Sequence, residues 1–144
     1  MAKSARAPKK KAARPAAAPR AAEKTPAPPN ERARESAMLI ARLGLDKKAL
    51  DVVVLDVRGL SSYAEYVVVM TAESDPQLGA IADHVEAAMK ERGERPIGIE
   101  GLRAGQWVLI DYGDVVAHVF YQDMRTFYDL EGLWADAQRT AVRD

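Results

Sequence analysis

The chain has 144 residues, 48% of them hydrophobic and none of them cysteine, with equal numbers of acidic and basic side chains. This length fits one domain with short extensions, and no apolar run approaches the ~18 residues that a membrane span needs. The lack of cysteine excludes disulfide bonds, thiolate catalysis and cysteine-based zinc sites. There is no signal-peptide core either, the absence of cysteine is compatible with a reducing cytosol, and we expect a cytoplasmic protein.

The zero net charge hides a segregation along the chain. Residues 1–34 hold ten Lys/Arg and two acids, a net charge of +8, whereas residues 35–144 hold eleven basic and nineteen acidic side chains, a net charge of −8. A basic arm on an acidic body indicates a protein that functions close to nucleic acid or to basic proteins.

Residues 1–30 consist mainly of Ala, Pro and Lys/Arg, with almost no large apolar side chain. Such a segment cannot bury enough surface to offset its ordering entropy, so we expect disorder. Two interpretations of this tail stay open: an electrostatic arm for RNA phosphates, or a solubilising extension without specific contacts. Its prolines disfavour the amphipathic helix of a transit peptide.

The folded domain is predicted to span residues 31–136. A helix is expected over residues 31–43, ended by Gly44, and Asp46 is expected to cap a further short turn at residues 47–49. The β-branched runs at residues 52–57 and 66–71 predict two strands joined by a turn.

A second helix is predicted to start at the sequence Ser74-Asp75-Pro76-Gln77, because a capping hydroxyl is followed by proline in the first turn. Apolar residues continue at helical spacing until Arg92 and a terminating Gly93. A short strand is expected at residues 97–100.

Residues 107–120, WVLIDYGDVVAHVF, predict a β-hairpin turning at Gly113. The central pair of the turn is either Gly113-Asp114 or Tyr112-Gly113, and the two registers leave every side chain on the same face. One face has a core composition: Val108, Ile110, Tyr112, Val115, Ala117 and Val119. The other is too apolar for a solvated surface and too polar for a core, so we expect either another element or a partner to cover it: Trp107, Leu109, Asp111, Val116, His118 and Phe120.

Residues 124–134 predict a last helix whose stripe of Phe127, Leu130 and Trp134 docks onto the sheet. Residues 137–144 are expected to fray. The order of elements predicts a single compact α/β domain, with a mixed sheet of about five strands and flanking helices.

The sequence provides weak support for catalysis. A strand–Gly-Ser–strand arrangement at Gly59 is loosely like nucleotidyltransferases, but the following strand offers Glu65 alone where a carboxylate pair would hold magnesium. A triad of Ser61 or Ser62 with His118 and Asp111 lacks the serine elbow. The two histidines, His84 and His118, lack nearby metal partners. We therefore predict no enzyme activity, no catalytic or metal site and no cofactor.

A partner-binding surface remains as the functional hypothesis. Aromatic residues ringed by polar groups have the composition of a protein–protein hot spot. The predicted contact residues are Trp107, Leu109, Asp111, Asp114, Val116, His118, Phe120, Arg125 and Tyr128.

Several separated motifs resemble the ribosomal silencing factor (Iojap) family. They are LDVRGLSSYAEY at 55–66, IADHV at 81–85, GIEG at 98–101, WVLIDYGDVVAHVF at 107–120, and R-x-x-x-D-L-E-x-L-W from Arg125 to Trp134. The resemblance implies a nucleotidyltransferase-like fold without the catalytic carboxylates. It also implies a non-enzymatic factor that binds the large ribosomal subunit through ribosomal protein L-fourteen, blocks association with the small subunit and represses translation under nutrient limitation.

Other functions stay open beside this one. The basic tail could make the protein an RNA-binding or ribosome-assembly adaptor, with rRNA as the contact. A residual nucleotidyltransferase is the weakest alternative. The free apolar sheet face also predicts a homodimer off the ribosome, with either partner covering the same patch.

Overall fold

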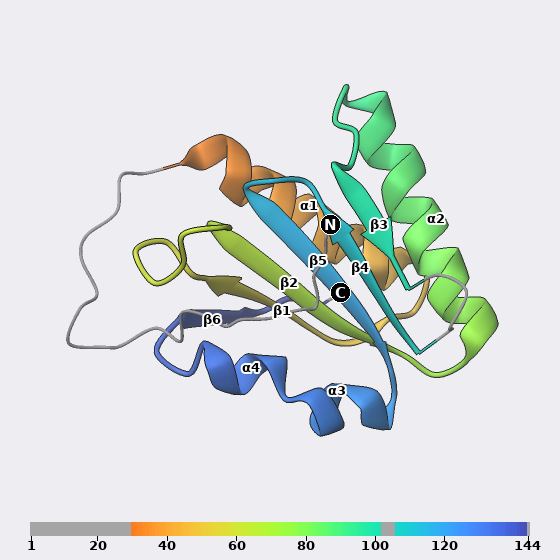
Figure 1. Ribbon diagram of the computed structural model, residues 1–144. Coiled ribbons are helices and arrows are strands. Elements are labelled where there is room, and N and C mark those ends of the chain that lie inside the picture. The colour runs from red at the N-terminus through yellow and green to blue at the C-terminus, as the bar shows by residue number, and fades with distance from the viewer. Residues whose placement is uncertain (1–29, 102–105, 144) are drawn as a thin grey trace.

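The computed structural model describes residues 30–101 and 106–143. Six strands form one mixed sheet in the order β3-β4-β5-β2-β1-β6, with helices on both faces (Figure 1). This confirms the predicted α/β class with one strand more than expected. The elements are α1 (Glu31–Asp46), β1 (Leu50–Asp56), β2 (Tyr66–Ala72), α2 (Asp75–Glu91), β3 (Gly98–Glu100), β4 (Trp107–Asp111), β5 (Val115–Tyr121), α3 (Asp123–Tyr128), α4 (Leu130–Leu133) and β6 (Gln138–Ala141).

Helices α1 and α2 cover one face of the sheet through continuous apolar stripes. The larger of two hydrophobic cores lies between these helices and the sheet, and we call it the first core. Ile40 and Ile81 are fully buried in it, together with Val108 and Val119 of the hairpin. The predicted start of α2 is confirmed, because the Ser74 hydroxyl accepts a hydrogen bond from the backbone of Gln77.

The predicted end of α1 was wrong. The helix continues through Gly44 to Asp46, and the short turn expected after it is present at residues 47–48, while the Asp46 carboxylate contacts His84. Gly44 serves close packing instead, since a Cβ there would lie 2.4 Å from Sδ of the buried Met70. A glycine inside a helix costs about 1 kcal/mol relative to alanine, and here it lets the helix approach β2.

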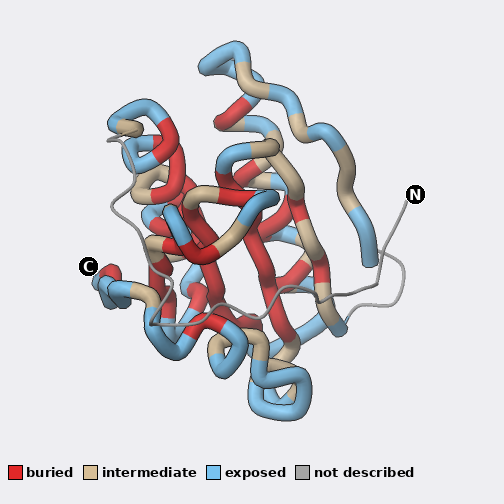
Figure 2. Tube along the Cα trace, turned by 60° about the vertical axis from the view of Figure 1, so that its left-hand side comes forward, coloured by how far each residue is buried: buried red, intermediate tan, exposed pale blue. Residues whose placement is uncertain are grey.

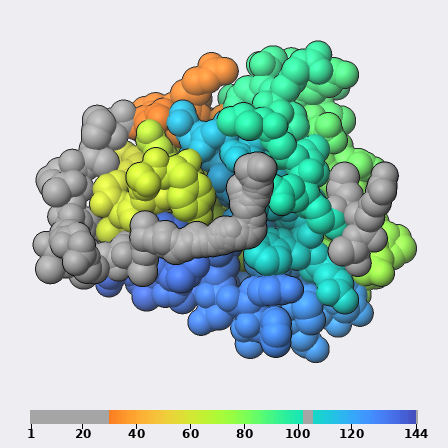
Figure 3. Space-filling view, in the orientation of Figure 1, coloured from red at the N-terminus to blue at the C-terminus, as the bar shows by residue number. Residues whose placement is uncertain are grey.

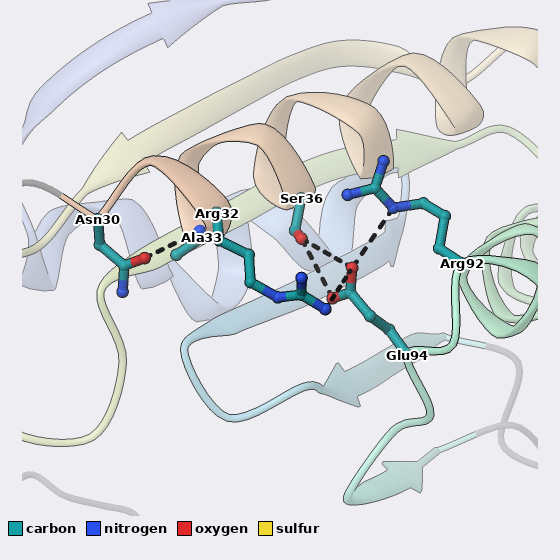
Figure 4. A network of polar contacts seen from close by, with 6 residues as sticks. All are labelled: Asn30, Arg32, Ala33, Ser36, Arg92 and Glu94. Carbon is teal, nitrogen blue, oxygen red and sulfur yellow. Dashed lines mark hydrogen bonds and ion pairs between the residues drawn. The ribbon is translucent and has the colours of Figure 1, made fainter.

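A polar network ties the end of α2 to α1 (Figure 4). The buried Ser36 hydroxyl donates to the Glu94 carboxylate at 3.1 Å, and Arg32 and Arg92 form ion pairs with the same carboxylate. At the start of α1, Asn30 accepts a hydrogen bond from the Ala33 backbone and caps the helix. These contacts hold the two helices of the first face together at the end that leads into β3.

The opposite face carries a smaller hydrophobic cluster, which we call the second core. It contains buried residues of β1, β2 and β5, the connection after β1, and Trp134. Leu130 packs against it from α4. The prediction of one helix over residues 124–134 was wrong, because Asp129 has left-handed backbone angles (φ 45°, ψ 48°) and separates α3 from α4. A left-handed residue cannot continue a right-handed helix.

The end of the chain was predicted to fray from residue 137, and this was also wrong. Residues 138–141 form β6, which pairs antiparallel with β1 from Gln138 opposite Asp56 to Ala141 opposite Val53. Val142 follows the strand and is buried in the first core. The pairing satisfies one edge of β1, which would otherwise expose its backbone groups.

The buried residues concentrate in the central strands, whereas the outward surfaces of the helices are exposed (Figure 2). Every residue of β2 is buried, because β2 pairs antiparallel with β1 on one side and parallel with β5 on the other. No helix among residues 30–101 and 106–143 is long and apolar enough to cross a membrane. The disorder predicted for the tail falls on residues 1–29, outside the described part.

Candidate partner-binding surface

The β4–β5 hairpin has the first of the two predicted registers. Trp107 lies opposite Phe120, and Asp111 lies opposite Val116. The backbone N–H of Tyr112 donates to the carbonyl of Val115 at 2.9 Å, which leaves Gly113 and Asp114 as the central pair. Gly113 has a φ of +90°, the left-handed region that the turn needs.

The two faces of the hairpin differ as predicted. The alternating residues from Val108 to Val119 belong to the first core. On the other face, a row on β5 is fully covered and a row on β4 is half-buried. The covered row is Val116, His118 and Phe120, and the half-buried row is Trp107, Leu109 and Asp111. The β5 row is therefore buried below the surface, and the β4 row is the part that a partner could contact.

Trp107 is held in place by three neighbouring side chains. Its indole N–H donates to Nδ1 of His118 at 3.0 Å. Its ring stacks on Phe120 at a centroid distance of 5.0 Å and contacts Tyr128 at 4.6 Å. A half-buried aromatic side chain held by three neighbours loses little conformational entropy when a partner covers it.

His118 is neutral in the folded protein. Its side chain is 3% exposed, and burial lowers its pKa to about 3. An imidazole that accepts the Trp107 N–H at Nδ1 carries its own proton at Nε2, which fixes the tautomer. Its structural role is thus to hold the tryptophan ring.

Helix α3 extends the aromatic surface beyond the sheet. Tyr128 is 47% exposed while it contacts Trp107, and the Phe127 ring meets the Tyr128 ring edge-on at 5.1 Å. The prediction that Phe127 docks onto the sheet was wrong, since its side chain is 75% exposed. In the space-filling view the teal surface of β4 adjoins the blue surface of α3 (Figure 3).

The other two predicted contact residues lie in different settings. Asp114 is exposed in the hairpin turn, and its carbonyl accepts hydrogen bonds from Glu65 and Tyr66. Arg125 has a side chain only 11% exposed, with its guanidinium engaged by Glu131, Thr71 and a backbone carbonyl. It therefore faces the inside of the protein and offers little to a partner.

Two side chains of the catalytic arrangements considered from the sequence have other partners. Nδ1 of His118 is occupied by the Trp107 indole and is not available to Ser61 or Ser62. Glu65 accepts a hydrogen bond from the Asn30 side chain at 3.0 Å. Within residues 30–101 and 106–143 there is no group of three His, Asp or Glu side chains placed to hold a metal ion.

The family model described as "ribosomal silencing factor during starvation" matches residues 30–144. The chain belongs to this family. Its relatives include the ribosomal silencing factor RsfS of Bacillus subtilis, 44% identical over 92 residues that cover 64% of this chain and 78% of the relative. A chloroplastic Iojap protein of Arabidopsis thaliana is 36% identical over 104 residues, covering 72% of this chain and 43% of that protein. Family membership places the chain among ribosome-associated regulators of translation and confirms the resemblance seen in the sequence.

Solved structures agree with this assignment. A protein from Chromobacterium violaceum superimposes with a TM-score of 0.70 at 35% identity, covering 77% of this chain and 92% of that one. A protein from Bacillus halodurans superimposes with a TM-score of 0.65 at 34% identity, covering 78% of this chain and all of that one. At these identities the likeness extends to the family as well as to the fold.

Sequence reasoning missed one residue that shapes the surface. Gly101 has a φ of +91°, and a Cβ there would lie only 1.9 Å from the carbonyl oxygen of Trp107. Any other residue would push the backbone of β4 away at the position that carries the tryptophan. The GIEG motif contained the signal, because an obligatory glycine indicates a close backbone approach.

Proposed function

We propose that the protein binds the large ribosomal subunit through ribosomal protein L-fourteen and sterically blocks association with the small subunit. Translation falls when nutrients are scarce, because a folded body occupies the position where the subunits must meet. The protein acts in the cytoplasm by binding and not by catalysis. The observation that carries this proposal is Trp107, a half-buried ring held by His118, Phe120 and Tyr128.

The surface around Trp107 has the features of a binding hot spot. Rigid aromatic rings lie at the open end of the hairpin, and polar groups lie toward its turn, Asp111 at the end of β4 and Asp114 in the turn itself. The described residues carry twelve Lys/Arg and nineteen Asp/Glu, so the folded body has a net charge of −7. An acidic body would approach a basic ribosomal protein faster than a neutral one, and added salt would weaken this effect.

Pelleting of purified large subunits with the protein tests this proposal. Trp107→Ala removes the central ring and should weaken binding about thirtyfold, the loss typical of a hot-spot residue. Asp111→Arg reverses the charge on the same strand and should also weaken binding. Asp83→Arg is the matched control, because Asp83 is exposed on α2, the helix that covers the opposite face.

Circular dichroism and thermal unfolding of each variant separate lost binding from lost folding. If the folded Trp107→Ala and Asp111→Arg proteins pellet as well as the Asp83→Arg control, the assignment of this surface is wrong. If the unaltered protein does not pellet with large subunits, the proposed function is wrong.

The basic tail supports a second candidate, an RNA-binding or ribosome-assembly adaptor. Eight Lys/Arg lie within residues 1–30 and would favour contact with rRNA phosphates. Deletion of residues 1–29, which keeps the Asn30 cap of α1, should abolish ribosome association if the tail is the main contact. If the Trp107 surface is the main contact, the deletion should only reduce affinity and its salt dependence.

Sedimentation of the free protein tests the related proposal that a second copy covers the same surface off the ribosome.

A further inference from the structure

Helices α3 and α4 are too short to be stable by themselves. They contain six and four residues, and neither contributes a fully buried residue. Isolated helices shorter than about 12 residues are marginal in water, because few hydrogen bonds offset the cost of nucleation. The left-handed Asp129 between them prevents the two from acting as one longer helix. Other contacts must therefore hold this segment on the sheet.

An ion-pair cluster spans the break between the two helices. Arg125 of α3 donates to both oxygens of the Glu131 carboxylate in α4, at 2.8 and 3.1 Å. Their side chains are only 11% and 18% exposed, so water screens the pair less than it would a surface pair. A planar guanidinium that meets two carboxylate oxygens also fixes direction, which a single contact does not.

The same cluster is anchored to three strands. Arg125 Nη1 donates to the Thr71 hydroxyl of β2 at 3.0 Å and to the backbone carbonyl of Asp51 in β1. Arg139 of β6 forms an ion pair with the second oxygen of Glu131. Hydrogen bonds from Arg125, and the charges of both arginines, hold the pKa of Glu131 below its usual value even though burial opposes this. Five elements thus meet at one guanidinium–carboxylate pair.

The space beside this cluster is not filled by side chains. A cavity of about 620 Å³ opens there, and its lining includes Arg125, Glu131 and Arg139 together with Leu45, Leu50 and Val53. Close packing is what normally fixes an element in a protein interior. Met124 of α3 and Leu130 of α4 pack against the second core, and on the side of the cavity it is the polar contacts that hold the two helices.

Arg125 and Tyr128 are three residues apart on α3, a spacing that places both on one side of the helix. Arg125 reaches β1 and β2, whereas the Tyr128 ring reaches Trp107 on β4. We infer that Arg125 and Glu131 are positioning residues that hold Tyr128 against Trp107 and so shape the partner-binding surface. The effect on ribosome binding rests on the proposed function, but the placement of Tyr128 by Arg125 and Glu131 can be tested without the ribosome.

Fluorescence of Trp107 reports the position of Tyr128. Trp107 and Trp134 are the two tryptophans of the chain, so Trp134→Phe leaves Trp107 as the sole reporter. The Trp134 indole N–H is buried without a hydrogen-bond partner, and phenylalanine would leave no such donor unsatisfied. In this background Glu131→Gln should increase acrylamide quenching of Trp107 in the native protein, because α3 loses its anchor and Tyr128 uncovers the ring.

Three further variants make the result specific. Glu91→Gln is the matched neutralisation on the exposed side of α2, and it should leave quenching unchanged. Ile40→Val destabilises the first core and should also leave native-state quenching unchanged, which separates positioning from general loss of stability. Arg125→Lys keeps the charge but loses the two-oxygen contact, so it should behave like Glu131→Gln.

Ribosome pelleting of the same variants completes the test. Glu131→Gln should weaken binding about tenfold, the scale of coupling between residues in contact. Equal quenching in Glu131→Gln and Glu91→Gln would overturn the inference. Increased quenching with unchanged ribosome binding would uphold the positioning role and contradict the proposed surface. Increased quenching together with weaker binding would support both.

Discussion

The two faces of the sheet are stabilised in different ways. On the first face, α1 and α2 have 16 and 17 residues and bury continuous apolar stripes. On the second face, α3 and α4 bury no residue completely and depend on the Arg125–Glu131 pair and a left-handed Asp129. The surface proposed for the partner lies on the second face. The comparison teaches that the long helices lie on one side of the sheet, whereas the proposed partner surface lies on the other.

The largest expected effect is a difference between two truncations. Ile40→Ala in the first core should lower the free energy of unfolding by about 4 kcal/mol, because Ile40 is fully buried and its loss leaves a cavity. Leu130→Ala over the second core should lower it by about 1 kcal/mol, because Leu130 is only half-buried. Urea unfolding measures both. Equal losses would show that the two faces share the stabilisation.

The second expected effect is a dependence of the free energy of unfolding on pH, which originates at His118 on the second face. Burial lowers the pKa of His118 to about 3 from a usual 6.5. Below about pH 6.5 the unfolded chain therefore takes up a proton that the folded protein does not, so stability falls as pH falls. The expected slope is about 1.4 kcal/mol per pH unit until the folded histidine also protonates near pH 3.

Urea unfolding at pH 7 and pH 5 measures this slope. His118→Gln keeps an acceptor for the Trp107 indole but does not titrate, so its stability should change less between the two pH values. Ile40→Val is the control from the first face and should keep the full pH dependence. A slope that is the same in the His118→Gln protein would show that the histidine is not the source.

The smallest expected effect concerns the break between α3 and α4. Asp129 has a φ of 45°, which glycine adopts without steric cost and alanine does not. Asp129→Ala should therefore lower the free energy of unfolding by about 1 kcal/mol, whereas Asp129→Gly should change it by less than about 0.5 kcal/mol. Thermal unfolding of the two variants measures the difference. If alanine is tolerated as well as glycine, the left-handed residue does not determine the shape of the second face.

The first face could be predicted from the sequence because its signals are local and periodic. The Ser74-Asp75-Pro76 start of α2, the β-branched runs and the alternation along the hairpin each follow from rules about near neighbours. The end of α1 was missed because the need for Gly44 arises from Met70, which is distant in sequence. A glycine that ends a helix and one that lets a helix pack closely have the same local pattern.

The second face could not be predicted because its contacts are long-range and polar. Phe127 was expected in the core because its spacing from Leu130 and Trp134 assumes an unbroken helix, and Asp129 breaks it. Arg125 was assigned to a partner because its sequence position does not reveal that Glu131 and Thr71 engage its guanidinium. The exposed polar residues of β6 lack the alternation that predicts a strand.

The parallel pairing of β2 with β5 also has a consequence for how the protein reaches its fold. Strands β1 and β2 form one antiparallel pair and β4 and β5 form another, and in the described sheet the two are joined by the pairing of β2 with β5. Residues paired across this seam, such as Val68 and Ala117, are far apart in sequence. Local hairpins close in microseconds, whereas contacts at long sequence separation form slowly. We therefore expect two preformed halves whose docking along the seam limits the folding rate.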